Sequence, residues 1–182
     1  MDRPDPLDDL DDLARELRTS VGGEFRRWAE EDEYAARKTQ LRSRTLEHIA
    51  HELLSRGDAV AVTLGSTVLH GTVVHAKGDL MALETRRGDR IDLRLGGPLT
   101  IRVVARSSDG GRGRDVAEPG SFVARLLELE LDEVPVMLTP APGSDTVTGV
   151  IEAVAEDHLM VTGDDGETTY IAMSNVVAVT RR

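Results

Sequence analysis

The sequence predicts a mainly β protein of the α+β class, in which a helical N-terminal segment precedes two tandem five-stranded small barrels, each led by a helix. Three observations predict this class: part of the chain repeats after 78 residues, apolar residues alternate in both copies, and glycines fall at matching positions. The predicted parts are an acidic amphipathic helical segment (1–41), a first barrel with its helix (42–105), a Gly/Arg-rich linker (106–120) and a second, acidic barrel with its helix (121–182).

The repeat aligns residues 71–104 with 149–182 without a gap. Its identical pairs are Gly71 with Gly149, Asp79 with Asp157, and Gly88 with Gly166. Upstream, the alternating apolar residues of 60–64 parallel those of 134–138 if a four-residue insertion is placed in the turn-forming string PAPGSD. The two copies therefore indicate one structural unit used twice.

Each copy has the alternation of five short strands. Gly71 and Gly149 lie inside the second strand of their copies, where a missing side chain indicates a sharp bend or a close backbone approach. Five short strands with a bent second strand favour a small closed barrel. The predicted strands are 58–64, 67–75, 79–85, 89–95 and 99–104 in the first copy, and 134–139, 146–154, 157–162, 167–172 and 175–180 in the second.

Helices are predicted ahead of both barrels and at the N-terminus. Gly57 ends an apolar helical pattern before the first barrel, and Ser121 is a candidate N-cap for the helix before the second. The N-terminal segment carries an apolar stripe at helical spacing, which packs either on the barrels or on another copy of the chain. We take its interaction residues to be Leu10, Leu13, Leu17, Phe25 and Trp28.

Composition excludes several classes of function. The chain has no cysteine, so it forms no disulfide or thiolate site, and only 3% of its residues are aromatic, which argues against base-stacking platforms. No apolar run approaches the length of a membrane span, and no signal peptide is recognisable, so we expect a cytoplasmic protein that does not associate with membranes. The net charge of −11 is uneven, since residues 121–182 carry 11 acidic and 3 basic side chains. Such a surface repels nucleic-acid backbones.

The strings VAVTLGSTVLHGTVVHAKGDLMAL and VPVMLTPAPGSDTVTGVIEAVAEDHLMV resemble the first motif of the Sm-like fold, in which apolar alternation leads to a glycine and then to an aspartate followed by apolar residues. The string TYIAMSNVVAV is similar to the closing stretch of the bacterial Hfq type of this family. Related SH3-like barrels have similar strings. The resemblance implies two divergent Sm-like barrels in a bacterial protein and, from the family, RNA binding.

The RNA sites of the family do not carry over to the matching positions. Ile171 and Ala172 stand where the Hfq type has a lysine–histidine pair after the tyrosine matched by Tyr170. Leu80 follows Asp79 without the asparagine of archaeal and eukaryotic members, and 95–97 replaces their arginine–glycine pair. The resemblance therefore predicts a fold rather than the family's RNA-binding mechanism.

Arginines supply the candidate nucleic-acid site. They form the main basic concentration of the chain, in the first barrel and the linker, and either bind phosphates or pair with neighbouring carboxylates. The candidate residues are Arg86, Arg87, Arg90, Arg94, Arg112 and Arg114. Asp79 and Asp157 are interpreted as caps for the turn that precedes the third strand of each copy.

Histidines give no recognisable catalytic or metal motif. His48 and His51 have a spacing that can share a metal ion, but we interpret them as ordinary helix residues because the order of a zinc-protease motif is missing. An enzyme with a site between the barrels would place His75 or His158 beside a carboxylate in a pocket. We expect no catalytic residue, cofactor, metal or small-molecule substrate.

The sequence thus favours a non-catalytic cytoplasmic binding or scaffold protein that acts through protein–protein contacts, including self-association. Contact between the two barrels of one chain would form an internal pseudo-dimer. The alternative is an RNA- or DNA-binding regulator that uses the arginines of the first barrel and the linker.

Overall fold

The computed structural model describes residues 28, 32–107, 110–111 and 119–181. The chain forms two units, Met1–Arg44 and Thr45–Arg182, which are described separately. In the first unit residues 32–42 are helical, and the side chains of Trp28 and Tyr34 are 71% and 68% exposed. Of the predicted interaction residues only Trp28 lies within the described part of the chain; Leu10, Leu13, Leu17 and Phe25 lie outside it.

Two helices of the second unit begin and end as the local sequence dictates. Helix α2 (Leu46–Arg56) follows Thr45, whose hydroxyl accepts a hydrogen bond from a backbone N–H of the first turn, and it ends at Gly57 with a φ of 70°. Helix α3 (Phe122–Leu131) follows Ser121, whose hydroxyl accepts from the backbone N–H of Ala124 at 3.1 Å. Both predicted helices are therefore present, with the predicted end at Gly57 and the predicted N-cap at Ser121.

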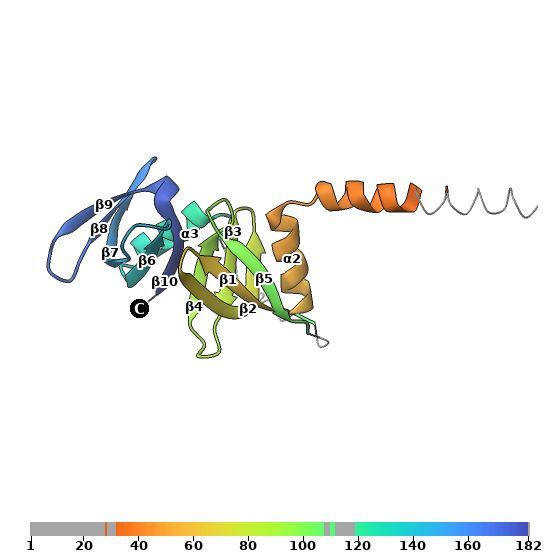
Figure 1. Ribbon diagram of the computed structural model, residues 1–182. Coiled ribbons are helices and arrows are strands. Elements are labelled where there is room, and N and C mark those ends of the chain that lie inside the picture. Colours follow the sequence, from red (N-terminus) through yellow and green to blue (C-terminus); the bar gives the residue numbers. More distant parts are fainter. Residues whose placement is uncertain (1–27, 29–31, 108–109, 112–118, 182) are drawn as a thin grey trace, which may run out of the picture. The chain divides into compact units, whose positions relative to one another are not determined.

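In the described part of the second unit there are also ten strands, and each lies within two residues of its predicted range. Their neighbours are all antiparallel (Figure 1). The strands are β1 (Ala59–Leu64), β2 (Thr67–Lys77), β3 (Leu80–Glu84), β4 (Arg90–Arg94), β5 (Thr100–Ala105), β6 (Pro135–Pro140), β7 (Val147–Val154), β8 (His158–Thr162), β9 (Thr168–Ala172) and β10 (Val176–Arg181), with a 3-10 turn η1 (Met173–Asn175) before the last.

The strand order is β5-β1-β2-β3-β4-β10-β6-β7-β8-β9. Each half of this order starts with its own last strand and then runs through its first four in sequence. The halves meet where β4 pairs with β10, at a contact we call the joint. Two separate closed barrels were predicted, whereas the described strands form one hydrogen-bonded sheet that is open at β5 and β9. The difference arises because the last strand of the second half pairs with the fourth strand of the first.

Details of the two halves correspond. The register of β2 with β3 shifts between Val73 and His75, and that of β7 with β8 shifts between Ile151 and Ala153, 78 residues later. A Cβ on Gly71 would lie 2.7 Å from a backbone carbonyl oxygen of β3, so the predicted close approach is present.

The register also corrects the upstream alignment. Gly71 lies opposite Val60, and Gly149 lies opposite Val136 rather than Val134. Val60 therefore corresponds to Val136, an offset of 76 residues, and the insertion amounts to two residues instead of four. The apolar alternation misled the alignment because a shift by two residues keeps every side chain on the same face.

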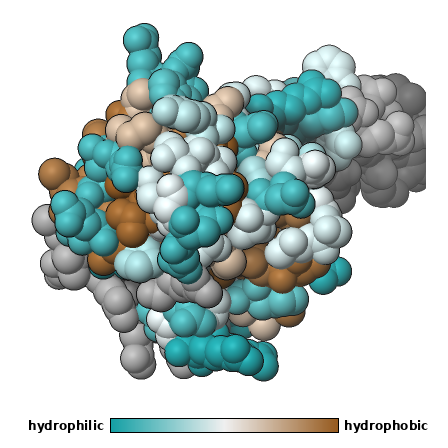
Figure 2. All heavy atoms as spheres, turned by 90° about the vertical axis from the view of Figure 1, so that its left-hand side faces the viewer, coloured by the Kyte–Doolittle hydropathy of each residue, from teal (hydrophilic) through white to brown (hydrophobic). Residues whose placement is uncertain are grey.

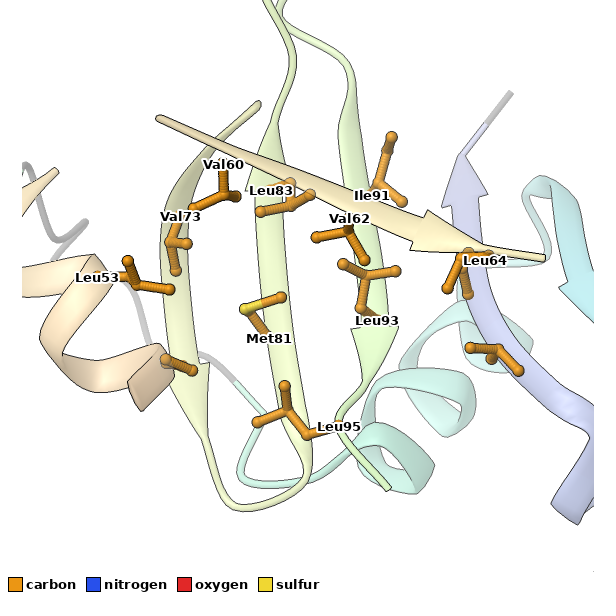
Figure 3. Close-up of a cluster of buried hydrophobic side chains, with 14 residues drawn as sticks. Leu53, Val60, Val62, Leu64, Val73, Met81, Leu83, Ile91, Leu93 and Leu95 are labelled. Atoms are coloured by element: carbon orange, nitrogen blue, oxygen red, sulfur yellow. The ribbon is translucent and has the colours of Figure 1, made fainter. Parts of the chain in front are cut away.

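Each half encloses a cluster of buried apolar side chains. In the first half β1 crosses over β2, β3 and β4, and side chains such as Val62, Met81 and Leu93 lie between the crossing strands (Figure 3). The second cluster contains Phe122, Leu126 and Leu129 of α3 together with residues of β6–β10. The clusters interlock: Val177 and Ala178 of β10 belong to the first, whereas Leu80 of β3 belongs to the second. The two halves therefore share their interior at the joint.

Candidate protein-interaction surfaces

A buried ion pair lies at the joint. The Nε of Arg125, on α3, donates to the carboxylate of Asp92, on β4, at 2.7 Å. Arg125 is 7% and Asp92 is 2% exposed. Asp92 also accepts from Arg90 at 2.8 Å, and Arg125 donates to Glu128 at 2.9 Å. Because buried charges require partners, these contacts hold α3 in one position against the first half.

A second polar contact crosses the joint. The guanidinium of Arg94, at the end of β4, donates to the carbonyl oxygens of Met173 at 2.6 Å and Ser174 at 2.9 Å. These carbonyls belong to the η1 turn of the second half. Arg94 therefore connects the two halves of the chain.

Asp79 has a different partner from the one predicted. Its carboxylate accepts from the backbone N–H of Phe122 at 2.8 Å, so it stabilises the first turn of α3 rather than the turn before β3. The prediction was wrong because an unpaired helix N–H from the other half lies within reach, which a local pattern does not reveal.

Asp157 does not serve as the predicted turn cap either: its carboxylate contacts the Nδ1 of the neighbouring His158 at 2.6 Å. This hydrogen bond, together with the charge of the imidazole, lowers the pKa of Asp157 from its usual value of 3.8. The ring of His158 also lies 5.9 Å from that of Tyr170, between centroids. The pair is on the surface, since the side chain of Asp157 is 87% exposed.

The structure separates the candidate arginines into three groups. Arg86 and Arg87 are exposed in the turn between β3 and β4. Arg90 and Arg94 engage the contacts described above. The two linker residues, Arg112 and Arg114, lie outside the described residues. Among the candidate arginines that the structure describes, only Arg86 and Arg87 are therefore exposed next to each other.

The histidines have separate surroundings. His48 completes the cap of α2 by accepting the N–H of Thr45 through Nδ1 at 3.4 Å, and His51 is exposed. His75 contacts the carbonyl oxygen of Pro119 at 3.2 Å. Within the described ranges, no three His, Asp or Glu side chains gather closely enough to hold a metal ion.

A hollow in the first half is lined by several side chains, among them His70, Glu84 and Arg86, but not by His75 or His158. It borders Gly110, at an end of the gap in the described residues. The enzyme hypothesis requires His75 or His158 beside a carboxylate in a pocket, and neither histidine lines this hollow.

The two open edges of the sheet expose apolar side chains that sequence reasoning did not select. On β5, Val103 and Val104 are 44% and 55% exposed, and on β9, Tyr170 is 67% exposed. On β10, which has strands on both sides, Val177 and Val179 are fully buried. For β5, the only sequence feature that could have indicated exposed apolar side chains was the presence of apolar residues on both faces of the strand.

The end of the molecule that holds β9 has a mixed surface. Figure 2 shows hydrophobic groups there between hydrophilic ones. Several of the hydrophilic residues of the second half are exposed carboxylates, including Glu152, Glu156, Asp164, Asp165 and Glu167.

Within the described part of the chain, no helix is both long enough and apolar enough to cross a bilayer. Neither the family models nor the curated proteins with which the chain was compared gave a match.

Proposed function

We propose that this protein is a non-catalytic cytoplasmic scaffold whose two halves are Sm-like barrels and which acts through protein–protein contacts. The fold part of the proposal is supported by the common strand order of the halves, by the register shifts 78 residues apart, and by a glycine in the second strand of each half that lies in close approach to the backbone of the third. In this proposal the two halves act as an internal pseudo-dimer, and the pairing of β4 with β10 at the joint supports it.

The observation that carries the proposed function is the charge of the second half. Residues 121–182 carry 11 acidic and 3 basic side chains, a balance of −8. Glu152 and Glu156 are exposed on this half and belong neither to the joint nor to the open edges. A surface of this charge attracts basic partners and repels nucleic acid. The partner we propose is therefore a protein with a basic surface.

The test uses capture of partners by the full-length tagged chain, with and without nuclease, in parallel with the variant Glu152→Lys/Glu156→Lys. A basic protein that is retained after nuclease treatment and lost with this variant supports the proposal. Direct binding of that protein to the purified chain, weakening with salt, is the required second result. Partners that disappear with nuclease, or that bind the variant equally well, would overturn it.

One observation favours nucleic acid as a second candidate: Arg86 and Arg87 are adjacent and exposed. If they bind phosphates, the variant Arg86→Gln/Arg87→Gln should weaken binding to duplex DNA and reduce the slope of log K against log salt by about 2. The matched control is Arg56→Gln, an exposed arginine on α2 that pairs with Glu52. No binding at low salt, or identical slopes for both variants, would eliminate this candidate.

A further inference from the structure

We propose that the outward face of β8 and β9 is the docking site for an amphipathic, basic helix of a partner protein. This face, which we call the helix platform, consists of the side chains of His158, Met160, Tyr170 and Ala172. The inference rests on the proposed function, because it takes a basic protein as the partner. It adds where that protein binds and which secondary structure it presents.

Alternation along the two strands separates the platform from the interior. Leu159 and Ile171 lie opposite each other and are buried in the second apolar cluster. Because successive side chains of a strand point to opposite faces, Met160 and Tyr170, which also lie opposite each other, face away from that cluster. Tyr170 is 67% exposed, and the side chain of His158 on the same face is 42% exposed. Both rings are therefore accessible to a partner.

The first half shows which element can cover such a face. A shift of 78 residues takes the opposed residues Ala82 and Asp92 to the positions of Met160 and Tyr170. Ala82 is 0% and Asp92 is 2% exposed. Helix α3 lies against this face, since its Arg125 donates to Asp92. The chain therefore already places a helix on the face that corresponds to the platform.

The dimensions of the platform suit one helix. Adjacent strands lie about 4.8 Å apart, whereas a helix with its side chains is about 10 Å across, so one helix covers two strands. In the first half, α3 contacts β4 and shares an apolar cluster with Leu80 of β3. The platform likewise consists of two adjacent strands, β8 and β9.

The platform lacks the charged side chains of its counterpart. Asp92 in the first half corresponds to Tyr170. Arg94 corresponds to Ala172. A helix on the platform therefore meets an aromatic ring and a thioether instead of a buried carboxylate, and it needs an apolar side chain where α3 has Arg125. This difference requires an occupant with an apolar stripe along its centre.

Carboxylates border the platform at both ends of its strands. Glu156 and Asp157 precede β8, Asp165 and Glu167 lie between β8 and β9, and all four are exposed. Figure 2, which views the end of the molecule that holds β9, shows hydrophobic groups bordered by hydrophilic ones. Residues 126–180 contain no Lys or Arg. Lysine or arginine residues beside the apolar stripe of a docked helix would therefore be attracted by the border.

The same charge distinguishes among the candidate occupants. A second copy of the chain has a net charge of −11, and residues 1–13 carry six acidic side chains and one basic side chain. The acidic border repels both of these, and it repels nucleic acid as well. A basic helix from a different protein complements both the apolar centre and the acidic border.

The test begins with a photoreactive group on the platform. In the full-length chain, benzoylphenylalanine replaces Tyr170 or, as the control, Leu131, which is 83% exposed on α3. The cells that produce the chain are irradiated, and the cross-linked segment is identified by mass spectrometry. We expect a segment with apolar residues at helical spacing and basic residues beside them, linked from position 170 and not from position 131.

The second step measures direct binding. The cross-linked segment is synthesised as a ¹³C-labelled peptide and titrated into the purified full-length chain, and its ¹³C chemical shifts in the complex report whether it is helical. Tyr170→Ala should weaken binding about 10-fold or more, as expected for a central aromatic contact, whereas Tyr170→Phe and the control Leu131→Ala should bind as the wild type does. An increase from about 50 to about 300 mM salt should also weaken binding, because the bordering charges are exposed. Far-UV circular dichroism checks that the variants are folded.

Several outcomes would overturn the proposal. Cross-links from position 170 that reach only a second copy, residues 1–27 of the same chain or nucleic acid, or no cross-link at all, would do so. A peptide that is extended when bound, or that binds Tyr170→Ala as tightly as the wild type, would also overturn it.

These outcomes can be distinguished from a failure of the proposed function. If a basic protein is lost with Glu152→Lys/Glu156→Lys but binds Tyr170→Ala with an unchanged Kd, the platform is wrong and the proposed function stands. If neither capture nor cross-linking yields a basic protein, the proposed function fails as well.

Discussion

Replacing Arg125 with methionine tests how the two halves are held together. The substitution keeps an unbranched apolar chain in place of the arginine stem but removes the partner of Asp92, which is 2% exposed. Removing one member of a buried ion pair costs about 3–5 kcal/mol, because the other charge stays buried without its partner. Asp92 retains its contact with Arg90 at 2.8 Å, so we expect a loss near the lower value, about 3 kcal/mol.

If the unpaired charge is the cause, the double variant Arg125→Met/Asp92→Leu should recover most of that loss, because apolar replacement of a whole buried pair is often neutral or stabilising. The control is Arg181→Met: Arg181 pairs with Asp132 at 2.6 Å, but both side chains are nearly half exposed, so the expected cost is below about 1 kcal/mol.

Urea unfolding followed by far-UV circular dichroism measures these differences in the free energy of unfolding. Fluorescence is a poor reporter here, since the one tryptophan, Trp28, is exposed and belongs to the N-terminal unit. A loss of less than about 1 kcal/mol for Arg125→Met, or a double variant no more stable than the single one, would refute the reasoning.

Three further predictions concern single positions. In urea unfolding, Gly71→Ala should lower the free energy of unfolding by about 1–3 kcal/mol, because the new Cβ would lie 2.7 Å from a backbone carbonyl oxygen. The control Gly96→Ala should be close to neutral, because the space around Gly96 is open. Asp79→Ala should cost about 1.5–3 kcal/mol by thermal or urea unfolding, because it removes a charged acceptor from the first turn of α3; equal stability of variant and wild type would contradict that role. The pKa of Asp157 should lie below 3.8 by NMR titration and should rise toward it in His158→Asn, since the histidine hydrogen bond favours the carboxylate. Because the folded-state pKa is the lower one, the contact stabilises the fold above the ordinary pKa, and this stabilisation is lost as the pH falls through the folded-state pKa. An unchanged titration of Asp157 in the variant would exclude the histidine as the cause of the lowered pKa.

Local patterns in the sequence were sufficient for the elements. Period-two alternation and turn glycines placed all ten strands within two residues, and Ser121 and Gly57 mark a helix start and a helix end as predicted. These signals succeed because side-chain direction and capping depend on residues that are close in sequence. The same dependence on neighbouring residues explains the one error of alignment, in which the counterpart of Val60 in the second copy was placed two residues too early in the sequence.

The candidate site was predicted less well. The sequence marked the arginines as one basic group, but Arg94 is used to bind carbonyl oxygens of the second half, and Arg90 pairs with Asp92. The alternative that these arginines pair with neighbouring carboxylates included Asp92, and its contact with Arg90 agrees with that reading. Arg125 was not selected, although it forms the buried pair of the joint with Asp92. Burial decides which charges remain on the surface, and burial depends on which strands become neighbours.

The sequence by itself determined the helix-led units, their glycine-centred second strands and the acidic character of the last third of the chain. Only the tertiary structure decided that β4 pairs with β10, that Asp79 serves a helix of the other half, and that β5 and β9 are left at the edges. The physical reason is that any exposed strand offers the same backbone donors and acceptors, so the choice of partner is made by packing between residues far apart in the chain.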